Sequence, residues 1–276
     1  MKSSQNESFN GKEPTVLIEV HANPGAMEPA VFADAVADTG LDAVVITRTN
    51  RTDGLEAYVS ALDEEDIEAY VGVELPLDRG AVVFIPRSPD ALKEYDWSTK
   101  AAHWTLEEIN ERLQSVDGAV IAAHPYFRDE TPPMGDRVYR LNPLSGVVTR
   151  IGRGRSAWDR LADQVADKRN GAKLASSGGV LEHLGCAGTV VPDSVESQAD
   201  LVDALLAGAC LPVELDDPDN PRDRVPPQPI ARTQGEDGRR DGRRDDRRGG
   251  RRDDRRGGRS DDRGRGRGPR GGRGRD

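Results

Sequence analysis

The sequence predicts an α/β barrel of parallel strands over residues 14 to about 217, followed by a disordered tail. Three observations predict this fold class. Short apolar runs rich in valine and isoleucine alternate along the chain with segments whose apolar residues recur at helical spacing. Polar and ionisable residues recur where these apolar runs end. No glycine-rich phosphate loop follows the first run, although such a loop would favour an open, doubly wound sheet over a barrel.

The apolar runs are the predicted strands. Continuous runs of this kind suit strands that are covered on both faces, as in parallel sheets. We expect eight strands, at residues 15–20, 43–47, 69–73, 81–85, 119–123, 146–149, 172–176 and 211–215.

Helices are expected between several of these strands. One covers 28–38 and ends before Gly40, and another covers 106–115 after a capping box of Thr105 and Glu108. A third opens at Ser156 and closes at Gly171, and a fourth runs from Ser194 to Leu206. Repeated βα units of this length are typical of barrels and doubly wound sheets.

Composition divides the chain into four parts: a flexible N-terminus (1–13), the barrel (14–217), a linker rich in proline and aspartate (218–235) and a low-complexity tail (236–276). The tail has 17 arginines and 10 acidic residues, which is +7, so the whole-chain charge of −10 leaves −17 for residues 1–235. The tail lacks alanine, aliphatic and aromatic side chains and cannot bury enough apolar surface to order itself. The acidic body is a poor nucleic-acid binder, so the tail alone has the right sign for phosphate.

Cysteine content and hydropathy point to a soluble cytoplasmic protein. The two cysteines, Cys186 and Cys210, have no metal-type spacing, which is typical of a reducing compartment. The N-terminus has no apolar core of a signal peptide, and no apolar run reaches about 18 residues, so we expect no membrane partner.

The predicted strands end on residues that carry chemistry. In a barrel the carboxyl ends of parallel strands converge on one rim, where catalytic side chains gather from separate strands. The residues at these ends are Glu19, His21, Arg48, Glu74, His124, Arg150 and Ser177.

Five segments, in order, resemble the motifs of the polymerase-and-histidinol-phosphatase (PHP) family of metal-dependent phosphoesterases. They are Glu19-Val20-His21-Ala22-Asn23, the run from Gly40 to Asn50, Gly72-Val73-Glu74, Ala123-His124-Pro125 and Ala175-Ser176-Ser177-Gly178-Gly179. The resemblance covers about residues 14–217 and implies a distorted (β/α)7 TIM-like barrel. It also implies up to three divalent metals that activate water and neutralise phosphate charge. His21, Glu74 and His124 match metal ligands, and Glu19 replaces the opening aspartate.

The departures from these motifs are larger than the matches. Asn23 stands where the family has a second histidine, and Arg48 and Thr49 replace an aspartate–histidine pair. Ser177 and Gly179 replace the aspartate and histidine of the last motif. A multinuclear site needs imidazoles and carboxylates at close quarters, and a fixed positive charge would repel the metal. We therefore expect the multinuclear phosphoesterase activity to be lost.

Two expectations follow for the remaining rim residues. A carboxylate at the end of a buried strand needs a partner, so we expect an Arg48–Glu74 ion pair in place of a metal bridge, with Arg48 available to phosphate. His103 is expected only to pack, and His183 is not counted as a ligand because it lies four residues past the motif position.

The tail resembles the Arg-Gly-Gly segments of RNA-binding proteins. Arginine contacts phosphate and stacks on bases, and glycine lets the chain follow an irregular strand. A solubilising or self-associating segment is the alternative. The arginines expected to contact phosphate are Arg263, Arg265, Arg267, Arg270, Arg273 and Arg275.

The sequence thus leaves two functions open. The first is a PHP-like pseudoenzyme with an eroded metal site that binds RNA or another phosphate-bearing partner. The second is an active phosphoesterase with one divalent metal (Mn, Zn, Fe or Mg) held by His21, Glu74 and His124, with Glu19 as a further candidate.

Overall fold

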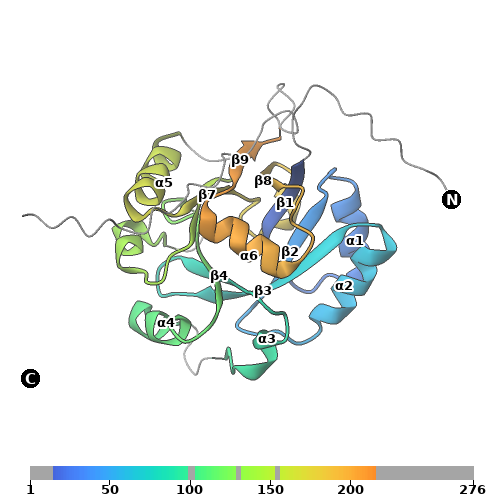
Figure 1. The fold of residues 1–276 in the computed structure, drawn as a ribbon, viewed down its shortest axis with the longest axis horizontal. Helices are drawn as coiled ribbons and strands as arrows, with labels where there is room; N and C mark the ends of the chain where they lie inside the picture. The colour runs from blue at the N-terminus through green and yellow to red at the C-terminus, as the bar shows by residue number, and fades with distance from the viewer. Residues whose placement is uncertain (1–14, 99–102, 129–131, 153–155, 216–276) are drawn as a thin grey trace, which may run out of the picture. The chain divides into compact units, whose positions relative to one another are not determined.

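A computed structural model describes residues 15–98, 103–128, 132–152 and 156–215, and these form a mixed α/β fold around one nine-stranded, nearly closed barrel-like sheet (Figure 1). The strand order is β7-β6-β5-β4-β3-β2-β1-β8-β9. The strands are β1 (Thr15–Ala22), β2 (Ala43–Thr49), β3 (Glu68–Pro76), β4 (Ala81–Pro86), β5 (Gly118–Ala123), β6 (Gly146–Arg150), β7 (Ala172–Ala175), β8 (Ala187–Pro192) and β9 (Leu211–Glu214).

The helices lie on both sides of this sheet. In Figure 1, α6 lies over the middle of the sheet, while α1, α2, α4 and α5 lie around its outside. The helices are α1 (Pro29–Ala37), α2 (Leu55–Glu64), α3 (Ala91–Glu94), α4 (Leu106–Leu113), α5 (Ser156–Arg169) and α6 (Gln198–Ala207), with 3-10 turns η1 (Gly135–Arg140) and η2 (Leu181–His183). None of the helices in the described ranges has the length and apolar character needed to cross a bilayer.

The middle parts of the strands are largely apolar because they are buried on both faces. In β2, Val45 joins the cluster of buried side chains that includes Leu201 and Leu205 of α6. Its neighbours Val44 and Ile46 join the other cluster, which includes side chains of α1, α2, α4 and α5. Alternate residues of a strand point to opposite faces, so a run without polar residues is what this arrangement requires.

A buried threonine joins β7, at one end of the sheet, to β8, the strand next to the other end. The Thr189 hydroxyl, on β8, donates to the carbonyl oxygen of Ala175 on β7 at 2.8 Å and accepts from the Ala175 N–H at 2.9 Å. This pair of bonds satisfies backbone groups at the β7 edge of the sheet that would otherwise be buried without partners.

The prediction of an all-parallel barrel is wrong. β4 is antiparallel to both β3 and β5, β8 is antiparallel to β1, and β9 is antiparallel to β8. Only residues 77–80 separate β3 from β4, and a parallel crossover needs a dozen residues or more, so this connection has to be a hairpin. The seven-fold βα repeat implied by the family resemblance is correspondingly not the observed order of elements.

Most of the predicted elements are present. The capping box of Thr105 and Glu108 is confirmed, with both reciprocal bonds formed. Strand β8 and helices α2 and α3 were not among the predicted elements. Helix α6 begins after Ser197 rather than Ser194, because the Ser197 hydroxyl accepts from the Asp200 N–H and caps the helix. The predictions for residues 1–13, 218–235 and the tail lie outside the described residues.

Candidate functional site

A cavity of about 520 Å³ lies where β1, β2, β3 and β5 end. We call it the rim cleft. All four histidines of the chain line it, although they come from four separate segments. Its lining residues are His21, Asn23, Thr49, Glu74, Pro76, Leu77, Gly80, Ala81, His103, His124, Gly178, Gly179, Val180, Glu182 and His183. The structure therefore brings the three predicted ligand positions, His21, Glu74 and His124, into one cavity.

Glu19 lies beneath the cleft and has no solvent exposure. Its two carboxylate oxygens accept from the backbone N–H groups of His21 (2.9 Å) and Ser177 (2.7 Å). Burial raises the pKa of Glu19, against the opposing effect of hydrogen bonds from Ser176, Ser177 and His21. Glu19 thus joins the end of β1 to the segment after β7, and it is not among the residues that line the cleft.

His21 forms part of the cleft wall and is 2% exposed. Its Nε2 lies 3.4 Å from Oε2 of Glu74, and its ring stacks on that of His124 with centroids 6.3 Å apart. Neither ring nitrogen makes a hydrogen bond with a described residue. Burial lowers the pKa of His21, but the negative charge of Glu74 outweighs it, and the pKa is raised. The contact with Glu74 accounts for Nε2, whereas Nδ1 is buried without a partner among the described residues.

Glu74 is the carboxylate of the inner cleft. The register of β2 and β3 pairs Thr49 with Glu74. Oε2 of Glu74 accepts from the Asn23 amide at 2.6 Å and from the Thr49 hydroxyl at 3.3 Å. Burial acts to raise the pKa of Glu74, but the His21 ring and the Asn23 amide outweigh it and lower the pKa to about 2. Glu74 is therefore an anion whose partners are supplied from within the cleft.

The predicted Arg48–Glu74 ion pair is not formed among the described residues. Because Thr49 pairs with Glu74, the side chain of Arg48 points to the opposite face of the sheet. Its Nη1 donates to the carbonyl oxygen of Asp53 at 2.9 Å. Asn23 and Thr49, rather than Arg48, are the partners of Glu74. The role of Arg48 in phosphate binding stays a prediction, for a side chain that does not line the cleft.

His103 is held at the cleft by the residue that follows it. The Trp104 N–H donates to the Pro76 carbonyl at 2.8 Å, and the Asp78 N–H donates to the Trp104 carbonyl at 3.3 Å. The Trp104 indole also donates to Asn50 Oδ1 at 2.8 Å. The strand-like pairing of Trp104 with the β3–β4 turn therefore places His103 against the cavity.

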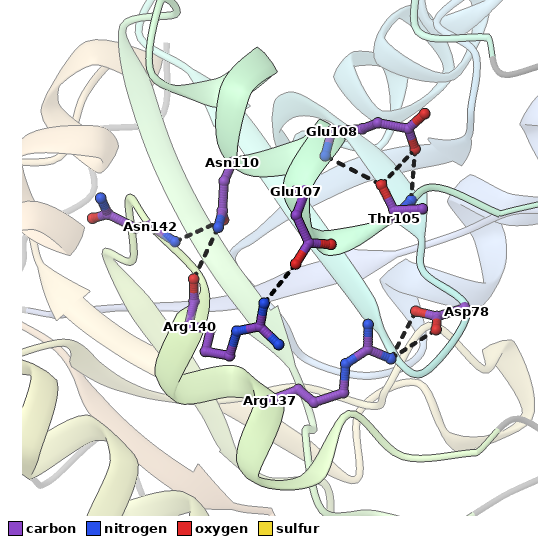
Figure 2. Close-up of polar contacts among 8 residues, drawn as sticks. All are labelled: Asp78, Thr105, Glu107, Glu108, Asn110, Arg137, Arg140 and Asn142. Atoms are coloured by element: carbon purple, nitrogen blue, oxygen red, sulfur yellow. Dashed lines mark hydrogen bonds and ion pairs between the residues drawn. The ribbon is translucent and has the colours of Figure 1, made fainter.

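The wall beside this turn is fixed by a set of polar contacts, which Figure 2 shows. Arg137 of η1 contacts both carboxylate oxygens of Asp78, at 2.8 and 2.7 Å. Arg140 pairs with Glu107 of α4 at 2.6 Å, and Asn110 accepts from the Asn142 N–H. These contacts hold η1, α4 and the β3–β4 turn against one another on the side from which His103 enters.

His183 reaches the cleft from the segment after β7. It ends the 3-10 turn η2, where its N–H donates to the Val180 carbonyl at 3.0 Å and its carbonyl accepts from the Cys186 N–H at 2.9 Å. Leu181 and Leu184 pack on the hydrophobic core on either side of it. The motif spacing did not place His183 or His103 at this cavity, although the chain has only four histidines.

Gly179 packs directly against the His21 ring. It has a φ of +74°, and a Cβ there would lie 2.9 Å from Cε1 of His21. A histidine at this position would collide with the His21 ring, so the two cannot coexist in this arrangement.

The residues of the cleft fit a metal only in part. Two ligands bonded at about 2.1 Å in tetrahedral geometry stand about 3.4 Å apart, and this is the separation of His21 Nε2 and Glu74 Oε2. However, no group of three histidine, cysteine, aspartate or glutamate side chains within the described ranges is arranged to hold a metal ion. The donor pair is suitable, but the described side chains do not complete the site.

Comparison with known proteins gives fold-level similarity only. No protein-family model matches the chain, and no curated protein matches it. Among solved structures, the chain is similar to a protein from Bifidobacterium adolescentis named as a metal-dependent phosphoesterase, with 13% identity, a TM-score of 0.45, and coverage of 59% of this chain and 88% of that one. It is also similar to an amidohydrolase from Chromobacterium violaceum, solved with bound sulfate and no metal, with 14% identity, a TM-score of 0.45, and coverage of 58% and 86%.

Proposed function

We propose that this protein is a PHP-like barrel that binds phosphate-bearing ligands in the rim cleft without hydrolysing them. The proposal rests on the hydrogen bonds that the Glu74 carboxylate already accepts within the cleft. Its Oε2 already accepts hydrogen bonds from Asn23 and Thr49, residues that stand where the family has metal ligands. The imidazoles of His103 and His183 also line the cleft and can donate hydrogen bonds to phosphate oxygens.

Metal analysis and turnover by the purified full-length chain test this function. We expect no stoichiometric Mn, Zn, Fe or Mg after dialysis, no turnover of p-nitrophenyl phosphate with any of these ions added, and saturable binding of methyl phosphate by calorimetry. Stoichiometric metal and turnover that are both lost in His124→Ala would overturn the proposal.

The Arg-Gly tail is proposed to add weak, sequence-independent affinity for RNA. Its net positive charge supports this, because each phosphate contact releases counterions and makes binding salt-dependent. A gel-shift comparison of the full chain with residues 1–235 should show RNA binding only by the full chain, weakening as salt rises. Equal binding by both proteins would remove the tail from the proposal and favour a solubilising role.

One observation favours a second function, a metal-dependent phosphoesterase that uses His21, Glu74 and His124. Both nitrogens of the buried His21 ring lack hydrogen-bond partners among the described residues, and Nε2 is spaced from Glu74 as a metal ligand would be. The metal analysis above separates the two functions directly.

A further inference from the structure

A second cavity, of about 300 Å³, lies between α2, β3 and α3, and we call it the α2–α3 pocket. Among the described residues, none lines both this pocket and the rim cleft. Its floor is apolar and consists of the buried side chains of Leu55, Val71 and Leu92, with Val59 and Ala69 half-buried beside them. The volume is at the lower end of the range for small-molecule sites, which suits a small ligand.

The polar side chains in the wall of the pocket already have partners in the protein. Gln198 lines the pocket, but its Oε1 accepts from the Val71 N–H at 2.9 Å and its Nε2 donates to the Pro86 carbonyl at 2.6 Å. The Ser60 hydroxyl donates to the Glu56 carbonyl at 3.0 Å. The part of a ligand that enters the pocket is therefore expected to be apolar, because a polar group there would lose its hydration without gaining a partner.

The mouth of the pocket carries two opposite charges. Among the described residues that line the pocket, Glu56 in the first turn of α2 and Lys93 in α3 are the charged ones, and Lys93 Nζ lies 3.2 Å from Glu56 Oε1. Both side chains are largely exposed, so the pair is weak and each member is open to a further partner. Asp90 also lies 3.6 Å from Lys93, which makes the mouth acidic overall and unfavourable for a ligand that carries a carboxylate alone.

The backbone on both sides of the mouth is fixed by buried contacts. The Tyr58 hydroxyl of α2 donates to the Met27 carbonyl at 2.6 Å. The Trp97 indole donates to the carbonyl of Leu92, the residue before Lys93, at 2.8 Å. The two charges are thus presented side by side, by two anchored helices, at the entrance of an apolar cavity.

We propose that the α2–α3 pocket binds a free aliphatic α-amino acid, with its ammonium group beside Glu56, its carboxylate beside Lys93 and its side chain on the apolar floor. An α-amino acid carries both charges on one carbon atom, which matches two adjacent charges of opposite sign. A lysine ammonium has three donors and a carboxylate accepts more than one hydrogen bond, so both residues can bind the ligand without separating from each other. This site is independent of the phosphate-binding function proposed for the rim cleft.

An NMR titration of the ¹⁵N-labelled full-length protein with four compounds tests the ligand class. L-leucine has all the proposed features, 4-methylpentanoate lacks the ammonium group, 3-methylbutylamine lacks the carboxylate, and glycine lacks the side chain. We expect saturable binding of L-leucine and at least about tenfold weaker binding of the other three, because each loses a contact with a charged group or the burial of the isobutyl group.

Two variants test the roles of the charged residues. Glu56→Gln should weaken binding of L-leucine and 3-methylbutylamine about tenfold without weakening 4-methylpentanoate, and Lys93→Gln should weaken L-leucine and 4-methylpentanoate about tenfold without weakening 3-methylbutylamine. Lys173→Gln removes an ion pair with Asp167 that lies outside the pocket and should leave L-leucine binding unchanged. Unchanged thermal unfolding shows that each variant is folded, and a purely structural role of the pair would not exchange the two analogues between the variants.

Each contrary result overturns a defined part of the proposal. Absence of saturable L-leucine binding overturns the site. Equal affinity for glycine or for 4-methylpentanoate overturns the aliphatic zwitterion as its ligand. L-leucine binding that is unchanged in both Glu56→Gln and Lys93→Gln overturns the assignment to this pocket. Methyl phosphate binding in the rim cleft is measured separately, so these results leave the proposed function as it stands.

Discussion

Gln198 and His21 are buried polar side chains near opposite ends of the barrel, and they differ in how their polar atoms are satisfied. Gln198, at the start of α6, is 7% exposed; its Oε1 accepts from the Val71 N–H at 2.9 Å and its Nε2 donates to the Pro86 carbonyl at 2.6 Å. His21, at the end of β1, is 2% exposed and has neither ring nitrogen bonded to a described residue. A buried polar group with all its bonds made is part of the fold, whereas one without them needs another explanation.

Two other buried polar atoms lack hydrogen-bond partners among the described residues, one near His21 and one near the α6 end. Ser177 Oγ, beside Glu19 under the rim cleft, is buried and has no partner among the described residues. At the other end, the Tyr70 hydroxyl is also without one, and burial raises its pKa to about 12. Tyr70 therefore remains neutral inside the core and costs the fold stability rather than marking a site, because it does not line the rim cleft.

The largest effect on stability is expected at the α6 end. Gln198→Leu removes both side-chain bonds and leaves the Val71 N–H and the Pro86 carbonyl buried without partners. Each such group costs about 1–3 kcal/mol, so the free energy of unfolding should fall by about 4 kcal/mol. Urea denaturation measures this, with the exposed Gln114→Leu as a matched control that should change by less than about 0.5 kcal/mol. A similarly small loss in Gln198→Leu would show that its two hydrogen bonds do not stabilise the fold.

The next effect is a pH dependence of the free energy of unfolding, which arises from Glu74 in the rim cleft. The pKa of Glu74 is lowered from 4.5 to about 2 in the folded protein, so its contribution to stability is fully present above about pH 4.5 and is lost as pH falls towards 2. The contribution is on the order of 3 kcal/mol. Glu74→Gln should therefore flatten the fall in unfolding free energy between pH 4.5 and 2, measured by urea titrations at successive pH values.

A matched variant isolates this effect from the general acid sensitivity of an acidic chain. Glu65→Gln changes an exposed carboxylate for which no partner is present among the described contacts, and it should leave the slope of the acid limb unchanged. Identical slopes in wild type and Glu74→Gln would show that Glu74 is not held as an anion by its neighbours.

The features of the fold differ in how well the sequence predicts them. Burial on both faces leaves a continuous apolar run, so β2 and β5 were located closely. Strand direction was predicted wrongly, although the short 77–80 connection was visible, because the repeated βα pattern was extended over a hairpin. Strand β8 was missed because its run, Ala187–Pro192, mixes glycine and threonine with two valines, and Thr189 is there to close the sheet.

The candidate site was predictable only where it lies on strands. His21, Glu74 and His124 end strands that the apolar pattern locates, and the convergence of strand ends in a barrel placed them together. His103 and His183 lie on segments whose path depends on tertiary contacts, such as the pairing of Trp104 with the β3–β4 turn. The partner of Glu74 was assigned to Arg48 on charge alone, whereas strand register decided it in favour of Thr49.

A smaller effect is expected from the close contact beneath the cleft. Gly179→Ala places a methyl group 2.9 Å from Cε1 of His21, at a residue whose φ of +74° favours glycine. The strained backbone costs about 1–2 kcal/mol, and the His21 ring has to shift. We expect a loss of about 2 kcal/mol in unfolding free energy together with weaker methyl phosphate binding. Gly25→Ala has a φ of +58° and open space around the added methyl group, so it should show the backbone cost while leaving ligand binding intact.

The last effect on stability is expected at His21 itself, and it is the sharpest test of the comparison. His21→Leu removes the contact of Nε2 with Glu74 but, unlike Gln198→Leu, leaves no buried backbone group without its hydrogen bond. Glu74 keeps the Asn23 and Thr49 bonds. The free energy of unfolding in urea should therefore fall by about 2 kcal/mol, which is less than the loss in Gln198→Leu, while methyl phosphate binding falls at least about tenfold. A loss of stability as large as that of Gln198→Leu, with ligand binding retained, would mean that His21 serves the fold and that the rim cleft is not built around it.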